Sequence, residues 1–212
     1  MIDLYTWHTP NGRKVSIMLE EIGMDYKVFP INIAKDEQFQ PHFLKISPNN
    51  RIPAIIDKDN NNYSLFESGA ILMYLAEKSG KLINKSNSDE YFRTMEWLMW
   101  QMGGVGPMFG QVHHFVKYNK GKSAYAEERY SKEARRLYGV MDKRLSVNPY
   151  IAGKEYSIAD ISIWPWTARF DWQEIDLNEF PNVARWYKEM IDRPAVQKGW
   201  LVPENDQLIP SI

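Results

Sequence analysis

The chain of 212 residues contains no cysteine. This excludes disulfide bonds, cysteine–zinc sites and any redox cycle that uses a thiol of the protein itself. Charge of either sign is not in excess, because 26 basic residues are balanced by 27 acidic ones and the formal net charge is -1. Proteins that bind nucleic acid through their charge are usually more basic. We therefore expect no nucleic-acid partner.

Long apolar runs are also missing. The longest, Ala70 to Ala76, is far too short to span a bilayer. Asp3 and a strand-like alternation near the start of the chain do not fit a signal peptide. With 44% hydrophobic and 25% charged residues, the composition is that of a globular protein. We expect a cytoplasmic protein that does not associate with a membrane.

Short strands and helices alternate over the first 80 residues. Strands are indicated by apolar alternation between turn residues, and helices by apolar residues spaced three and four apart. The expected elements are a strand over 2–6, a helix through 15–22, a strand over 26–33, a helix over 38–46, strands over 54–57 and 63–66, and a helix over 67–80. The first three form a βαβ unit, which favours a parallel pair of strands.

Strand signals disappear from Asp89 onward. Helical spacing of apolar residues predicts helices through 89–102, 134–145 and 183–190, and Gly103-Gly104 with Pro107 are expected to kink or end the first of them. The polar segment 81–88 is the expected linker. We therefore predict an α/β domain over 1–80 and an all-helical domain over 89–212.

Distinctive motifs lie at the junctions of these elements. Ile52-Pro53 is similar to the cis-proline turn of thioredoxin-like folds, and Glu67-Ser68 resembles the pair that grips glutathione in glutathione transferases. Ser157 to Asp160 is similar to the capping motif of the family's core helix. The segments that resemble the bacterial nu class are Thr9–Gly12, Gln38-Phe39, Ser47–Asn50, Leu65–Ile71, Gly106–Met108, His113–Phe115, Glu128–Tyr130 and Ile163–Trp166.

The resemblance covers nearly the whole chain. It implies a thioredoxin-like N-terminal domain, a homodimer, glutathione as co-substrate without a metal, and reduction of small disulfides. The glutathione-binding residues that it implies are Asn11, Gln38, Ile52, Pro53, Glu67, Ser68 and Arg129. The backbone of Ile52 would bind the cysteinyl peptide unit, and Gln38 the glycyl end. Glu67 would bind the γ-glutamyl ammonium and Ser68 its carboxylate, while Arg129 would reach glutathione in the other subunit.

These residues also have plainer interpretations. Glu67 and Ser68 could form only a helix start, Gln38 could be a surface residue, and Arg129 could belong to a basic helix face. The pair His113-His114 is not expected to bind a metal, because adjacent residues on a helix point to different sides.

The turn before the first helix carries the candidate catalytic residues Thr9 and Asn11. Both can donate a hydrogen bond to a thiolate, and either could instead only cap the helix. Tyr5 is expected to pack within its strand. A disulfide reductase without cysteine must take both electrons from glutathione, so that one thiolate attacks the substrate and a second glutathione resolves the mixed disulfide. Two alternatives stay open: conjugation of glutathione to small electrophiles, and non-catalytic binding of glutathione or another ligand.

Overall fold

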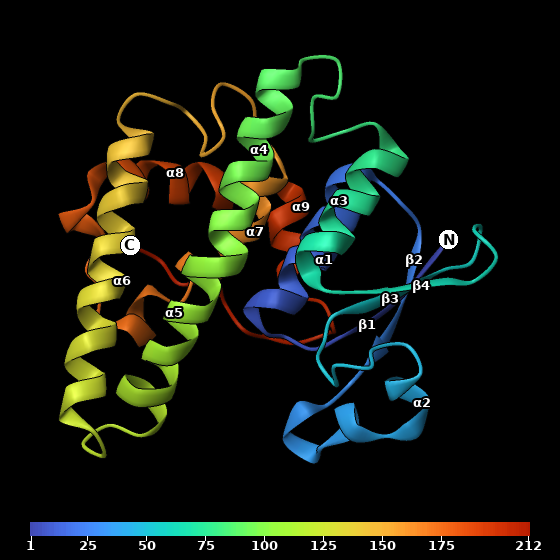
Figure 1. The fold of residues 1–212 in the computed structure, drawn as a ribbon, viewed down its shortest axis with the longest axis horizontal. Coiled ribbons are helices and arrows are strands. Elements are labelled where there is room, and N and C mark those ends of the chain that lie inside the picture. The colour runs from blue at the N-terminus through green and yellow to red at the C-terminus, as the bar shows by residue number, and fades with distance from the viewer. The chain divides into compact units, whose positions relative to one another are not determined.

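The structure, a computed structural model, describes residues 1–212 as two compact units. The first comprises 1–81 and 191–209, and the second comprises 82–190 and 210–212. The first unit thus takes in residues 191–209, which the predicted division placed with the helical domain. The reason is that α9 (Pro194–Trp200) lies directly against α1 (Pro10–Ile22) (Figure 1).

A four-stranded sheet forms the centre of the first unit. Its strands are β1 (Ile2–Thr6), β2 (Tyr26–Pro30), β3 (Ala54–Asp57) and β4 (Tyr63–Phe66). They lie in the order β2-β1-β3-β4; β1 and β2 are parallel, and the other two pairs are antiparallel. The strand predicted over 26–33 ends at Pro30, because Asn32 caps a short 3-10 turn by accepting a hydrogen bond from the N–H of Ala34.

Helices cover both faces of this sheet. Figure 1 shows α1 and α3 (Ser68–Ser79) side by side, with the short α2 (Pro41–Leu44) beyond the other side of the strands. Phe43 of α2 packs with Ala54 and Tyr5, and the Tyr5 ring also stacks on Phe29 at 4.8 Å, so Tyr5 is a packing residue as predicted. In place of the helix predicted over 38–46, a 3-10 turn over 37–39 is followed by α2, because Pro41 has no N–H to continue a helix.

The second unit is helical. Its helices are α4 (Ser88–Trp100), α5 (Gly106–Val112), α6 (Ala124–Leu145), α7 (Ile158–Thr167) and α8 (Pro181–Ile191), with 3-10 turns over 170–173 and 177–179. Gly103-Gly104 and Pro107 do not end the helical path. It continues from α4 into α5 through a π-helical segment over 101–105, and a second such segment follows over 113–118. Pro107 lies in the first turn of α5, directly after the π-helical segment over 101–105.

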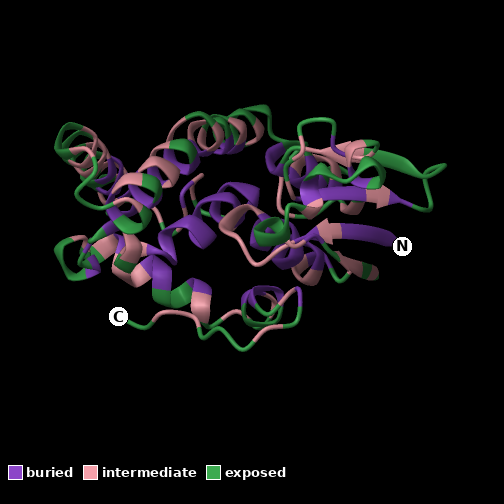
Figure 2. Ribbon diagram, turned by 90° about the horizontal axis from the view of Figure 1, so that it is seen from below, coloured by how far each residue is buried: buried purple, intermediate pink, exposed green.

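Helix α7 is the core of the second unit, since all its residues are buried (Figure 2). Ser157 and Asp160 form the predicted capping box, in which Asp160 accepts a hydrogen bond from the N–H of Ser157 at 3.0 Å. Asp160 also accepts from the N–H of Ile151 and the indole of Trp186. No helix of the protein is long and apolar enough to cross a membrane.

Candidate functional site

Thr9 sets the start of α1. Its side-chain oxygen accepts a hydrogen bond from the N–H of Gly12 at 3.1 Å, so Thr9 is the N-cap. Gly12 is required at this tight turn, because a Cβ there would lie 2.1 Å from the carbonyl oxygen of Trp7. The capping interpretation of Thr9 is therefore correct, and its hydroxyl still has a hydrogen to donate.

The electrostatics at the start of α1 favour an anion. Its first turn holds no acidic residue that would offset the positive end of the helix dipole. Asn11 follows Thr9 in this turn and is half-buried. Arg13 serves the fold: its guanidinium lies 3.4 Å above the ring of Trp200 and donates to the Trp200 carbonyl. The hydroxyl, amide and helix N-terminus together are suited to holding a thiolate.

The turn before β3 contains a cis peptide bond between Ile52 and Pro53. Pro53 is buried and Ile52 is half-buried. The paired residues of β3 begin at Ala54, so Ile52 lies just outside the ladder. Its backbone groups therefore lie at the end of a strand, where an extended peptide can pair with them.

The junction between β4 and α3 is built from Glu67 and Ser68. Glu67 has φ 71 and ψ 113, a conformation that costs free energy for a residue with a side chain and that clusters at functional sites. Its exposed carboxylate accepts a long hydrogen bond from Asn49 at 3.5 Å. Ser68 is the first residue of α3 and is 3% exposed. Ser68 at the helix N-terminus can bind an anion, and the carboxylate of Glu67 next to it can bind a cation.

Gln38 is buried, which contradicts its interpretation as a surface residue. The side chain is 8% exposed, and its Nε2 donates to Asp36 at 3.5 Å. The Oε1 atom is buried and has no hydrogen-bond partner in the protein. An unpaired buried amide oxygen is costly unless a ligand satisfies it, which an N–H of a bound peptide would do.

Arg129 lies in the second unit, on α6, and is exposed. It lines a groove of about 610 Å³ on α5 and α6 whose charged side chains have both signs. The groove is lined by Met108, Tyr125, Glu128, Arg129, Tyr130, Lys132, Glu133 and Arg136. The basic face predicted for this helix is thus mixed, since Glu128 pairs with Lys132 and Glu133 with Arg136.

His113 is a buried packing residue. Burial and the charge of Arg169 lower its pKa to about 4, so the ring is neutral near pH 7. It stacks on Trp166, and its Nε2 lies 3.1 Å from the Gln173 amide. His114 is exposed, so the adjacent imidazoles have different surroundings. The structure contains no group of three or more histidine, aspartate or glutamate residues that could hold a metal ion.

Lys14 was not predicted as a site residue, and the structure places it beside Ser68. Its Nζ donates to the Ser68 hydroxyl at 3.3 Å, and the side chain is 1% exposed. The signal was present, because Lys14 precedes Met18 and Ile22 by four and eight residues and so shares their buried helix face.

Two family models match the chain. The model of the glutathione S-transferase N-terminal domain matches residues 1–77, and that of the C-terminal domain matches residues 104–194. The disulfide-bond oxidoreductase YfcG of Escherichia coli (strain K12) is 47% identical over 205 residues, which is 95% of each chain.

Two solved structures are similar throughout. A glutathione transferase family member from Pseudomonas fluorescens pf-5, with two glutathione bound, has a TM-score of 0.89 and 45% identity over 94% of this chain and 92% of its own. A glutathione transferase from Pseudomonas putida, with one glutathione disulfide bound per subunit, has a TM-score of 0.89 and 43% identity over 95% and 91%.

Proposed function

This chain belongs to the glutathione S-transferase family, and we propose that it is a glutathione-dependent disulfide-bond oxidoreductase of the nu class. One observation carries the proposal: a thioredoxin-like unit without any cysteine begins α1 with Thr9 and Asn11. The reactive sulfur must then belong to the ligand. The protein supplies orientation and stabilises the sulfur as a thiolate.

Glutathione has groups that match the first unit. The γ-glutamyl carboxylate binds at Ser68 and the N-terminus of α3, and its ammonium binds at Glu67. The backbone of Ile52 binds the cysteinyl peptide unit, with Pro53 ending the ladder before it. Gln38 accepts a hydrogen bond from the glycyl end through the oxygen that is otherwise unpaired. In this binding mode the cysteinyl sulfur would lie near the start of α1.

The thiolate is the first chemical requirement. A free thiol has a pKa of about 8.5, and lowering it by two units requires roughly 2.7 kcal/mol of preferential stabilisation of the thiolate. One hydrogen bond to a charged group contributes about 1.5–3 kcal/mol, and a helix N-terminus adds about 0.3–1 kcal/mol. Hydrogen bonds from Thr9 and Asn11, together with the N-terminus of α1, are therefore sufficient to lower the thiol pKa by two units.

The reaction proceeds by two exchanges. The bound thiolate attacks one sulfur of the substrate disulfide, which forms a mixed disulfide and releases the first substrate thiolate. A second glutathione thiolate then attacks the glutathionyl sulfur, which forms glutathione disulfide and releases the other substrate thiolate. The two protons lost by glutathione end on the product thiols, and two electrons pass to the substrate. Bound pairs of glutathione, and bound glutathione disulfide, in the two similar Pseudomonas structures support this stoichiometry.

We propose that the active form is a homodimer. Phe92 and Met99 lie seven residues apart on one face of α4 and are 65% and 52% exposed. An exposed apolar face of this kind is suited to association. In the dimer, Arg129 of the partner subunit would bind a carboxylate of glutathione. The cytoplasm suits both the chain and its co-substrate, since this compartment keeps glutathione reduced.

The test is a pair of assays on the purified protein. A small dialkyl disulfide with glutathione, glutathione reductase and NADPH reports disulfide reduction, and chlorodinitrobenzene with glutathione reports conjugation. We expect disulfide reduction to be much faster, and Ser68→Ala to slow it by weakening glutathione binding. Faster conjugation would contradict the proposal in favour of a conjugating transferase. Tight glutathione binding without either activity would favour a non-catalytic binding protein.

A further inference from the structure

Lys14 is a buried cation at the start of α3. Its side chain extends from the second turn of α1, is 1% exposed and donates to the Ser68 hydroxyl at 3.3 Å. Ser68 is itself 3% exposed. An ammonium group and a hydroxyl therefore meet at one buried point, at the N-terminus of a 12-residue helix.

Burial opposes the charged form of Lys14. Burial lowers the pKa of Lys14 to about 7, and the carboxylate of Glu67 opposes a smaller part of this shift. Glu67 is exposed, so solvent weakens its attraction. Near neutral pH the charged and neutral forms of Lys14 are thus closely balanced. A second anion at Ser68 would favour the charged form.

We propose that Lys14 binds the γ-glutamyl carboxylate of glutathione together with Ser68, and that it takes up a proton when it does so. The inference rests on the proposed function, in which this carboxylate lies at the start of α3. The helix contributes roughly half an elementary charge there, and Lys14 contributes a full one. Lys14 and Glu67 would then match the two charges of the γ-glutamyl zwitterion, which selects this group over thiols that lack it.

The signature of this role is a pH dependence of affinity. A ligand that raises the pKa of Lys14 from about 7 binds best where Lys14 is already protonated. We expect Lys14→Met to weaken binding of S-hexylglutathione, and the ratio of its dissociation constant to that of the wild type to fall about tenfold between pH 6 and pH 8. Titration of the ligand's amine affects both proteins and cancels in the ratio.

Lys81→Met is the matched control. Lys81 belongs to the same unit, and its ammonium donates to the carbonyl of Ile22 at 3.0 Å. Its removal should leave the ratio of the variant's dissociation constant to that of the wild type constant across this pH range.

Proton uptake can also be measured on the wild type alone. Calorimetric titration at pH 7 is carried out in phosphate and in Tris, because these buffers differ in ionisation enthalpy. Uptake of about half a proton per site is expected.

The outcomes separate the inference from the proposed function. A ratio that stays constant for Lys14→Met, or no proton uptake by the wild type, would overturn the role of Lys14 while Ser68→Ala still weakens binding. If Ser68→Ala leaves the affinity unchanged, the γ-glutamyl subsite itself is misplaced, and the inference fails with it. A pH-dependent ratio together with weakened binding by Ser68→Ala supports both.

Discussion

The side-chain oxygen of Thr9 accepts a hydrogen bond from the backbone N–H of Gly12, with the two atoms 3.1 Å apart. The hydroxyl hydrogen takes no part in this bond and remains available for donation. A single residue can thus cap α1 and stabilise a negative sulfur near the N-terminus of the helix. The two interpretations of Thr9 that the sequence left open are therefore compatible.

We expect Thr9→Ala to lower kcat for disulfide reduction about tenfold, because one hydrogen bond to a thiolate is lost. Glutathione affinity should change less, since the γ-glutamyl and backbone contacts remain. Thr9→Ser, which keeps the hydroxyl and the cap, should retain most of the activity. Steady-state kinetics together with calorimetric glutathione titration measure both effects. An unchanged kcat in Thr9→Ala would move the sulfur contact to Asn11 or to backbone N–H groups.

Arg129 offers a second test, directed at the proposed dimer. Replacing it by Gln removes a charge-assisted hydrogen bond, so glutathione affinity should fall about tenfold or more. Arg136→Gln is the control, because Arg136 lines the same groove but donates to Glu133 at 2.7 Å. Calorimetry gives the affinity, and analytical ultracentrifugation gives the oligomeric state. A wild-type monomer, or equal affinity in both variants, would refute the role across subunits.

The sequence predicts best where the signal is local. The strands over 54–57 and 63–66 have the predicted bounds, because a polar turn separates two short apolar runs. The burial of Gln38 and the position of Lys14 beside Ser68 were not predicted, since both depend on segments that meet only after folding. For the same reason, the packing of α9 against α1 was not predicted.

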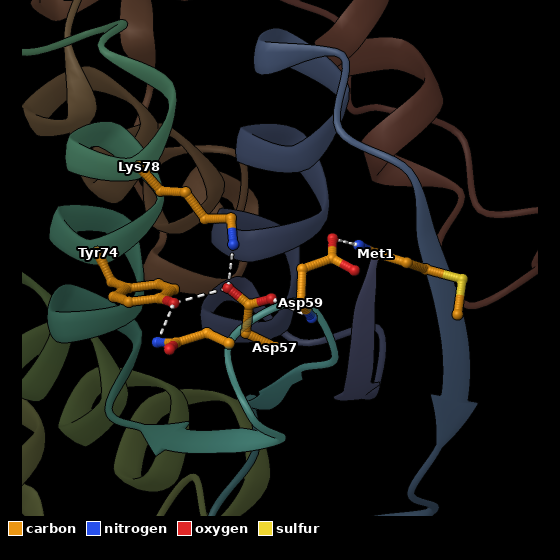
Figure 3. A network of polar contacts seen from close by, with 6 residues as sticks. Met1, Asp57, Asp59, Tyr74 and Lys78 are labelled. Atoms are coloured by element: carbon orange, nitrogen blue, oxygen red, sulfur yellow. Dashed lines mark hydrogen bonds and ion pairs between the residues drawn. The ribbon is translucent and has the colours of Figure 1, made fainter.

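Asp57 is the centre of a polar network between β3 and α3 (Figure 3). Its buried carboxylate accepts from the Tyr74 hydroxyl at 2.6 Å and pairs with the ammonium of Lys78. Burial alone would raise the pKa of Asp57, but the hydrogen bonds from Lys78 and Tyr74 outweigh this effect and hold the pKa below its usual value. This network should therefore stabilise the fold in a pH-dependent way.

We expect Asp57→Asn to lower the free energy of unfolding at pH 7 by about 1–3 kcal/mol. A carboxyl whose folded pKa is depressed stabilises the fold above its unfolded pKa of about 3.9 and loses this contribution as the pH falls through the folded pKa. The difference between variant and wild type should therefore shrink below about pH 4. Urea unfolding at several pH values measures it.

Asp59→Asn is the control for the Asp57 prediction. The Asp59 carboxylate is exposed and pairs with the N-terminal ammonium of Met1, which Figure 3 also shows. Exposed ion pairs contribute little, so this variant should stay close to the wild type at every pH. A destabilisation by Asp57→Asn that is equal at neutral and acid pH would show that the charge of Asp57 is not what stabilises the network.

Replacing two glycines by alanine should change the stability of the protein in opposite directions. Gly199 in α9 lies against α1, where an added Cβ would be 2.6 Å from the Cα of Ile17. Gly139 lies within α6, and an added Cβ would meet no atom within 4 Å. Gly199→Ala should therefore destabilise the protein by about 1–3 kcal/mol, because two backbones must move apart. Gly139→Ala should stabilise it by about 0.5–1 kcal/mol, since alanine is the better helix former.

Thermal unfolding of both variants tests how residues 191–209 are held. If α9 is an integral part of the first unit, a clash with Ile17 lowers the midpoint, and Gly139→Ala raises it. A neutral Gly199→Ala together with a stabilising Gly139→Ala would mean that α9 can shift away from α1 without cost. The Arg13–Trp200 contact would then not fix the C-terminal segment, and residues 191–209 would not belong to the first unit.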